Sequence, residues 1–377
     1  MAIIEKPRYG LPNNIVYSAL TDYANTKKLF TCDMLYNNFL ISKSIGKGGS
    51  GLILDTIVTN DIPEYHLFKN DHVALKYCNL SLYICDPDSG FLKTELNVLI
   101  ANNVMHNNFI CDTINFSLGI FSSCPIMKKY FKELGGYISA HSEDEAMRME
   151  EDNKGGLMFI LQHIEGFNLL HVKNEHLTTL LKLNQNIIFE MLYSAICCYL
   201  CLGYIQDDLH GDNIMISSKY PSKVLYKIGD KTLLFECVHR PCLIDFGVVG
   251  FYDDTNKFAN ASKIINWCKT LLGVGGIDAY PTFFKDDKIL NLSVSQFLYT
   301  LPDLYNDNQI FLNDASVLMN NKNIISLSID NEKINEMKPY KDALFTSLTS
   351  MRGGYKHKYL KYKMKYIKLK KMKIHSV

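Results

Sequence analysis

Two short polar runs near the middle of the chain constrain its fold and chemistry more than any other feature. Residues 208–213 read Asp-Leu-His-Gly-Asp-Asn, and residues 243–247, after an apolar segment typical of a β-strand, read Leu-Ile-Asp-Phe-Gly. They supply an acid, an asparagine five positions later and a second acid, Asp245. Magnesium-assisted phosphoryl transfer needs such a set, with one group to orient the attacking hydroxyl and two metal ligands. The runs predict this chemistry if phosphate-binding parts lie upstream.

A glycine-rich turn lies upstream, after an expected strand at residues 40–45. Glycine lets backbone amides approach phosphate oxygens and permits positive φ. A GxGxxG pattern alone is weak, because a glycine-rich hairpin turn satisfies it too. The strand-loop-strand context argues against a dinucleotide site, in which a helix follows the glycines. The candidate nucleotide contacts here are Gly46, Lys47, Gly48, Gly49, Ser50, Gly51 and Ile53.

A lysine and a glutamate follow in the required order. Lys76 ends the apolar segment 73–76, and Glu95 lies 19 positions later in an expected helix that begins near Ser89. Glu95 lies beside the apolar stripe of this helix, where its carboxylate can pair with Lys76 and hold the ammonium group on the phosphates. Taken singly, Lys76 reads as a strand-edge residue and Glu95 as a solvated helix residue.

The ordered set of glycine loop, lysine, helical glutamate, Asp/Asn pair and Asp-Phe-Gly resembles the eukaryotic-type protein kinase superfamily over about residues 40–275. Divergent serine/threonine kinases of giant viruses and poxviruses are the subgroup it resembles most. The resemblance implies an α+β, two-lobed kinase-like fold that uses ATP and Mg²⁺. The roles it implies are phosphate binding by Lys76, anchoring of that lysine by Glu95, orientation or deprotonation of the substrate hydroxyl by Asp208, and metal binding by Asn213 and Asp245.

The apolar run at residues 157–161 is expected to form a buried strand, and residues 162–166 are expected to form the hinge between the lobes. His163 is taken as a partly exposed linker residue. The adenine contacts that the resemblance implies are Ala74 and the backbones of Gln162 and Ile164.

The chain departs from the family pattern around the catalytic acid. Residues 206–208 read Gln-Asp-Asp where the family has His-Arg-Asp, so the arginine that pairs with a phosphorylated activation loop is missing. We therefore expect activity without phosphorylation of that loop. His210 replaces the usual lysine and is a candidate donor to the γ-phosphate. No Ala-Pro-Glu follows Asp-Phe-Gly, and an expected helix at 258–272, with Trp267, comes early.

Two other readings remain open. His210 and the missing Ala-Pro-Glu favour a small-molecule phosphotransferase of the aminoglycoside or choline type, whereas Asp-Phe-Gly and the Lys76 to Glu95 spacing favour a protein kinase. The third reading is a nucleotide-binding pseudokinase scaffold, against which the intact catalytic set argues.

The expected organisation has four parts. An apolar helix at 187–202, ended by Gly203, is expected in the core of the larger lobe, and an extra hairpin is expected at 224–235. Helices and loops are expected for residues 276–350. The parts are an N-terminal extension (1–39), an N-lobe (40–163) with an acidic insertion near 141–156, a C-lobe (164–350) and a basic Tyr/Lys-rich tail (351–377).

The tail differs in charge from the rest of the chain. Of the 40 Lys and Arg residues, ten lie in 352–377, so the remainder carries 30 basic against 39 acidic residues, a formal charge of −9. Tyrosines recur in the tail at helical spacing. Such a helix suits an anionic membrane, nucleic acid or an acidic protein, and it equally suits docking on this protein's own acidic body.

Composition predicts an intracellular protein. The chain has 377 residues with 47% hydrophobic content, enough for a large core, and neither a signal peptide nor an apolar run of membrane-spanning length is expected. The 11 scattered cysteines, three of them in the apolar helix, are expected to be free thiols in a reducing compartment. The expected setting is host cytoplasm, or a virion if the protein is viral, and the expected state is a monomer that acts on protein substrates.

Overall fold

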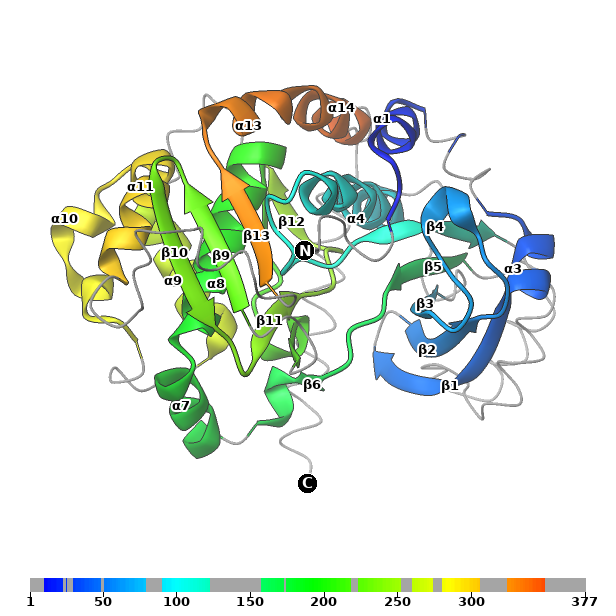
Figure 1. The fold of residues 1–377 in the computed structure, drawn as a ribbon, viewed down its shortest axis with the longest axis horizontal. Helices are drawn as coiled ribbons and strands as arrows, with labels where there is room; N and C mark the ends of the chain where they lie inside the picture. The colour runs from blue at the N-terminus through cyan, green and yellow to red at the C-terminus, as the bar shows by residue number, and fades with distance from the viewer. Residues whose placement is uncertain are drawn as a thin grey trace.

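The computed structural model describes residues 10–22, 25, 30–48, 51–78, 90–122, 157–172, 174–217, 223–251, 260–273, 280–305 and 324–349. These residues form a mixed α+β protein, in which a sheet lies beside a part that contains most of the helices (Figure 1). This confirms the expected α+β class. The acidic insertion, the basic tail and glycine-loop residues 49–50 lie outside the described residues.

A five-stranded antiparallel sheet lies on the right of Figure 1. Strands are present where they were expected at residues 40–45 and 157–161. The order of the strands is β1-β2-β3-β5-β4. Their bounds are β1 Phe39–Gly48, β2 Gly51–Val58, β3 His72–Cys78, β4 Ser117–Ser122 and β5 Leu157–Gln162.

The register of β2 against β3 decides which side chains share a face of this sheet. Ile53 is opposite Lys76, and Asp55 is opposite Ala74. Directly opposed residues of antiparallel strands project to the same side, so these four side chains lie on one face. Leu75 projects to the other face and is completely buried. The alternation of side chains along β3 therefore places Lys76 on the opposite face of the sheet from the buried Leu75.

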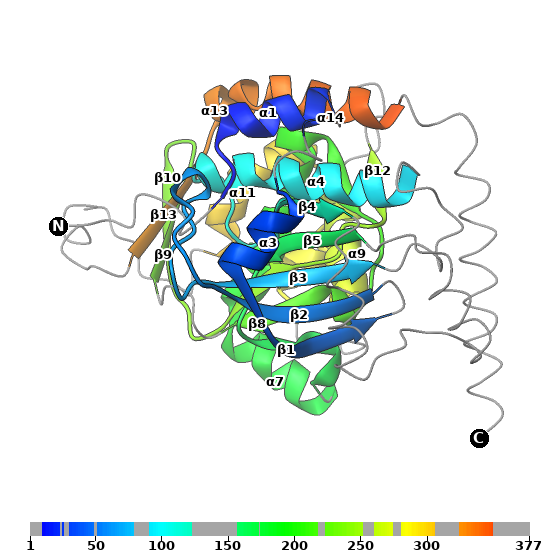
Figure 2. The ribbon, with the colours of Figure 1, turned by 90° about the vertical axis from the view of Figure 1, so that its right-hand side faces the viewer.

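Helix α4 (Gly90–Asn107) is held from several sides by its own asparagines. Asn103 Oδ1 accepts a bond from the backbone of Leu11 (2.9 Å), and Asn97 donates to Ser347 (3.1 Å). Asn102 accepts a bond from the hydroxyl of Tyr204. Helices α1 (Asn13–Thr21) and α14 (Lys338–Thr349) pack on α4 and on each other (Figure 2). The first and last described helices thus support the same element.

Helix α8 (Gln185–Cys197) is the centre of the helical part. It continues as a π-turn, Cys198–Leu202, and ends at Gly203, whose φ of 75° is left-handed and favours glycine. By length and apolar composition, the stretch Gln185–Leu202 matches a membrane span, which corrects the expectation that no run reaches that length. Of this stretch, 83% is buried inside the protein, as expected for a core helix.

Further helices surround α8. Helices α7, α9 and α11 pack against it. The remaining helices, including short 3₁₀ turns, are α3 Cys32–Asn38, η1 Pro63–Tyr65, η2 Leu169–His171, α7 Asn174–Leu183, η4 Gly211–Asn213, α9 Ala261–Leu272, η6 Thr282–Lys285, α10 Asp287–Leu290, α11 Val294–Leu304 and α13 Asn331–Glu336. Helix α9 corresponds to the helix expected at 258–272. It begins at Ala261, after the cap residue Asn260, and ends at Leu272 as expected.

Three small sheets complete the described part. The expected hairpin forms from β9 (Lys223–Ile228) and β10 (Lys231–Glu236), which are antiparallel. A third strand, β13 (Ile324–Ile329), pairs with β9 in parallel, which corrects the expectation of only helices and loops in residues 276–350. The other strands are β6 Phe167–Asn168, β7 Tyr204–Gln206, β8 Ile214–Ser217, β11 Arg240–Leu243 and β12 Val249–Phe251.

The described cysteines are mostly buried thiols. The free and buried ones are Cys111, Cys197, Cys198, Cys201, Cys237, Cys242 and Cys268. This confirms the expectation for the three cysteines of the apolar helix. Cys32, which begins α3, is disulfide-bonded and departs from the expectation that all thiols are reduced.

Candidate active site

Two pairs of strands bring the two polar runs of the sequence together. Strand β7 precedes the run at 208–213 and pairs with β12, which follows the run at 243–247. Strand β8 follows the first run and pairs with β11, which precedes the second. The backbone N–H of Ile244 donates to the carbonyl of Asn213 at 2.9 Å. Two loops that are distant in sequence therefore lie side by side.

Gln206 connects these two loops. Its buried side-chain nitrogen donates to the carbonyls of Ile244 (2.6 Å) and Asp245 (2.8 Å). Its own carbonyl accepts a bond from the indole nitrogen of Trp267 at 2.7 Å. The sequence marked Gln206 only as a departure from the family pattern, so its positioning role was missed. The available signal for this role was the amide side chain of Gln206 directly before the two acids Asp207 and Asp208.

Lys76 meets two acids that come from distant parts of the chain. Its ammonium nitrogen donates to Glu95 Oε1 at 2.5 Å and lies 3.3 Å from Asp245 Oδ1. The Lys76 and Glu95 side chains are 6% and 1% exposed, whereas that of Asp245 is 37% exposed. The cation is therefore held from inside by Glu95 and reaches an accessible carboxylate on its other side.

The backbone at Asp245 is left-handed, with φ of 58°. This conformation is uncommon for a residue other than glycine and costs free energy unless surrounding contacts hold it. Such contacts are present, because the N–H of Gly247 donates to Asp245 Oδ1 (3.4 Å) and Phe246 is completely buried against Tyr204. The turn thus fixes the carboxylate next to Lys76.

The loop around Asp208 is also held by its own residues. Asn213 Nδ2 donates to the backbone carbonyl of Asp208 at 2.8 Å. His210 Nε2 lies 3.3 Å from the Asp208 carboxylate, and His210 Nδ1 lies 3.7 Å from that of Asp212. The side chains of Asp208 and His210 are 30% and 45% exposed. Both functional groups can therefore reach a molecule in solvent.

The glycine turn joins β1 to β2. Gly46 is opposite Ile53 and Gly48 is opposite Gly51, so a tight hairpin is formed at the expected position. Gly49 and Ser50 lie outside the described residues, as do the side chain of Lys47 and those of its neighbours in the turn. Ile53 shares the sheet face of Lys76, as described above.

The expected hinge follows β5. The N–H of Gln162 donates to the carbonyl of Phe116 at 3.1 Å. Within the part of the chain that the structure describes, the backbone of Ile164 makes no hydrogen bond. Ala74 is opposite Leu161 in the β3 to β5 register and lies on the face of Lys76. Ala74 therefore lies beside the end of β5, next to the expected hinge.

The two acids at Lys76 have opposite pKa shifts. Burial raises the pKa of Glu95 to about 7, against the attraction of the Lys76 charge. Burial also acts to raise the pKa of Asp245, but the charge of Lys76 and the bonds from Lys76 and Gly247 outweigh it and hold the pKa below its usual value. Asp245 is therefore the anionic partner at neutral pH, while Glu95 loses its proton only near pH 7.

The raised pKa of Glu95 predicts a pH-dependent stability. From about pH 5 to about pH 7 the folded protein retains a proton that the unfolded chain releases, so the free energy of unfolding should fall as pH rises. The expected slope from this group is on the order of 1 kcal/mol per pH unit. Urea unfolding of the wild type and of Glu95→Gln, which cannot titrate, measures the difference. Parallel pH profiles for the two proteins would contradict it.

Comparison with known proteins does not identify a family for this chain. No protein-family model matches this chain, and no curated protein matches it. Support for a function therefore comes from the residues and distances of the site itself.

Proposed function

We propose that this chain is an ATP- and magnesium-dependent protein kinase with a two-lobed kinase-like fold, which transfers the γ-phosphoryl group to serine or threonine hydroxyls. The observation that carries the proposal is the contact of Lys76 with both Glu95 and Asp245, 19 and 169 positions away in sequence. A buried lysine bonded to one acid and facing a second, accessible acid is the arrangement that phosphate binding beside a metal needs.

Each proposed role follows from where its side chain lies. Glu95 holds the ammonium of Lys76, which points a fixed cation at the phosphates. The partly exposed carboxylate of Asp208 orients the substrate hydroxyl and takes up its proton. His210, in contact with that carboxylate, donates to the γ-phosphate or positions Asp208. By resemblance to protein kinases, the glycine-loop amides would cover the phosphates and the hinge backbone would bind adenine.

The residues proposed to hold magnesium fit that ion. Mg²⁺ prefers oxygen ligands, and Asp245 supplies a carboxylate whose pKa is lowered. Asn213 uses its amide nitrogen to bond the Asp208 carbonyl, which leaves the amide oxygen for a cation. When bound, magnesium would neutralise charge on the transferring phosphoryl group.

A small-molecule phosphotransferase is the second candidate. The exposed His210 between Asp208 and Asp212 favours it, because these two partly exposed carboxylates also suit a cationic small substrate. A pseudokinase scaffold is the third, and it would retain nucleotide binding without transfer. For the kinase we further propose an intracellular monomer that acts without phosphorylation of its activation loop. Its basic tail at 352–377 would bind an anionic membrane, nucleic acid or an acidic protein.

Transfer of labelled γ-phosphate to a generic acceptor protein, with Mg·ATP, tests the proposal. Lys76→Met should lower the transfer rate by about 10²–10³-fold, because a preorganised cation is lost. The protein should stay folded, since Glu95, with its raised pKa, can take up a proton when its partner is removed. Lys69→Met, which alters an exposed lysine outside the site, is the matched control.

The outcomes separate the candidates. Equal transfer by Lys76→Met and Lys69→Met would refute the proposed role of Lys76. Transfer only to small aminoglycoside or choline-type acceptors would favour the second candidate. Saturable ATP binding without transfer to any acceptor would favour the scaffold.

A further inference from the structure

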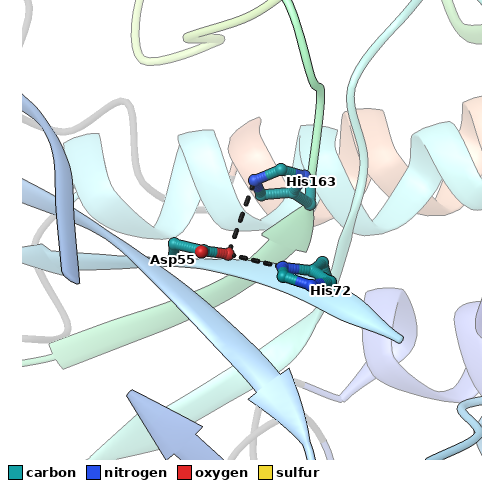
Figure 3. A group of neighbouring side chains, drawn as sticks. All are labelled: Asp55, His72 and His163. Atoms are coloured by element: carbon teal, nitrogen blue, oxygen red, sulfur yellow. Dashed lines mark hydrogen bonds and ion pairs between the residues drawn. The ribbon is translucent and has the colours of Figure 1, made fainter. Parts of the chain in front are cut away.

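A cluster of side chains that could hold a metal ion lies toward the other end of the sheet face that carries Lys76. It consists of Asp55 from β2, His72 from β3 and His163 just beyond β5 (Figure 3). His72 Nδ1 lies 2.8 Å from Asp55 Oδ1, and His163 Nε2 lies 3.5 Å from the same oxygen. Both rings thus face one carboxylate oxygen. No local pattern predicts this cluster, because its three residues are far apart in the sequence, and His163 was expected to be a partly exposed linker residue.

The spacing of these atoms matches a small coordination sphere. One ligand atom from each residue lies within 4.8 Å of the other two. A tetrahedral zinc ion with bonds of about 2.0–2.2 Å separates its ligands by about 3.4 Å, so small side-chain shifts would close the site around an ion. Two imidazoles and one carboxylate form a ligand set that suits zinc better than magnesium or calcium, which prefer oxygen ligands alone.

The other carboxylate oxygen is already held in place. Ser42 Oγ lies 2.9 Å from Asp55 Oδ2. Ser42 lies where the β1 to β2 register shifts, between Ile41 and Lys43, and a bulge of this kind re-aims a side chain. Metal-binding carboxylates are commonly oriented by such an outer hydrogen bond. Asp55 is thereby fixed with Oδ1 turned to the two histidines.

Exposure and charge also suit an ion. Asp55 and His163 are 8% and 18% exposed, whereas His72 is 46% exposed and provides a path for entry. Burial lowers the pKa of His163, against the attraction of Asp55, which favours the neutral imidazole that a metal needs. The negative charge of Glu165 also acts to raise the pKa of His163, and the positive charge of Lys43 acts to lower it.

We propose that Asp55, His72 and His163 form a zinc site with a fourth position open to solvent. The ion would tie β2, β3 and the end of β5 together next to the hinge. None of the three side chains has a proposed role in phosphoryl transfer, and His163 lies in the expected hinge between Gln162 and Ile164. Zinc binding therefore tests this site separately from the transfer reaction.

Zinc titration of the metal-stripped full-length protein tests this site. Calorimetry and equilibrium dialysis should show saturable zinc binding that magnesium does not displace. His163→Ala and His72→Ala should each weaken that binding about 100-fold or more, whereas His171→Ala, which alters another exposed histidine, should not. Cobalt in place of zinc should give the visible absorption of a tetrahedral site, lost in the same two variants.

A second pair of variants keeps the proposal testable if a histidine variant fails to fold. Ser42→Ala should weaken zinc binding about 10–100-fold by releasing the Asp55 carboxylate, and Ser44→Ala on the same strand should leave it unchanged. No saturable zinc binding by the wild type would overturn the proposal. Equal zinc binding by the wild type, His163→Ala, His72→Ala and Ser42→Ala would also overturn it, because the ion would then be bound elsewhere in the chain.

Discussion

Replacing Asp208 by alanine is expected to lower phosphoryl transfer by about 10²–10⁴-fold, which is the usual contribution of a positioned general base. Nucleotide binding should persist, because Asn213 is held by the backbone carbonyl of Asp208, which alanine retains. Lys76, Glu95 and Asp245 are also untouched. The measurement is the transfer rate from Mg·ATP to an acceptor protein, together with the Kd for ATP of the same preparation.

Asp207→Ala is the matched control for this experiment. Asp207 is the adjacent acid and is exposed, and its backbone N–H donates to the carbonyl of Val248, a bond that alanine keeps. Its transfer rate should stay within a few-fold of the wild type. If Asp208→Ala and Asp207→Ala behave alike, the catalytic role of Asp208 is wrong. If ATP binding is lost as well, the loop rather than the carboxylate has been disrupted.

Replacing Asp112 by alanine is expected to lower the free energy of unfolding by about 3–5 kcal/mol. Arg240 is 1% exposed and donates two bonds to Asp112, at 2.7 and 2.8 Å, and one to Glu190, at 2.7 Å. Removing Asp112 leaves a buried guanidinium with two of these three charge-assisted bonds unmade. Urea unfolding at neutral pH measures the loss.

An exposed ion pair provides the control for burial. Asp342 accepts a bond from Lys338 at 2.7 Å one helical turn away, but both side chains are more than half exposed. Asp342→Ala should therefore cost less than about 1 kcal/mol. Equal losses for Asp112→Ala and Asp342→Ala would show that the buried cluster does not stabilise this protein.

Local patterns in the sequence predicted the elements that depend on neighbouring residues. The hairpin of β9 and β10 could be predicted because two β-type runs flank a turn that contains Gly229. The end of the core helix could be predicted because Gly203 tolerates a left-handed φ. The strands β1 and β5 could be predicted from short β-type runs at residues 40–45 and 157–161. Each of these signals is contained in about fifteen residues or fewer.

The features that were missed depend on partners far away in sequence. The parallel pairing of β13 with β9 joins segments about 100 residues apart and leaves no local pattern. Arg240 and Asp112 are 128 positions apart, and only the fold shows that they meet. The cluster at Asp55 likewise assembles from three separate strands or strand ends. The order of motifs predicted that Glu95 pairs with Lys76, because that order could be compared with a known family.

The packing of α1 and α14 on α4 links the two ends of the described chain to the acid that holds Lys76. Tyr17 of α1 contacts Tyr340 of α14 edge to face, and each helix also bonds or packs on α4, which carries Glu95. A molecule that binds either terminal helix and shifts α4 would change the affinity of the lysine for its ligand. Thermodynamic reciprocity then requires that ligand to change, by the same factor, the affinity of the molecule at the terminal helices.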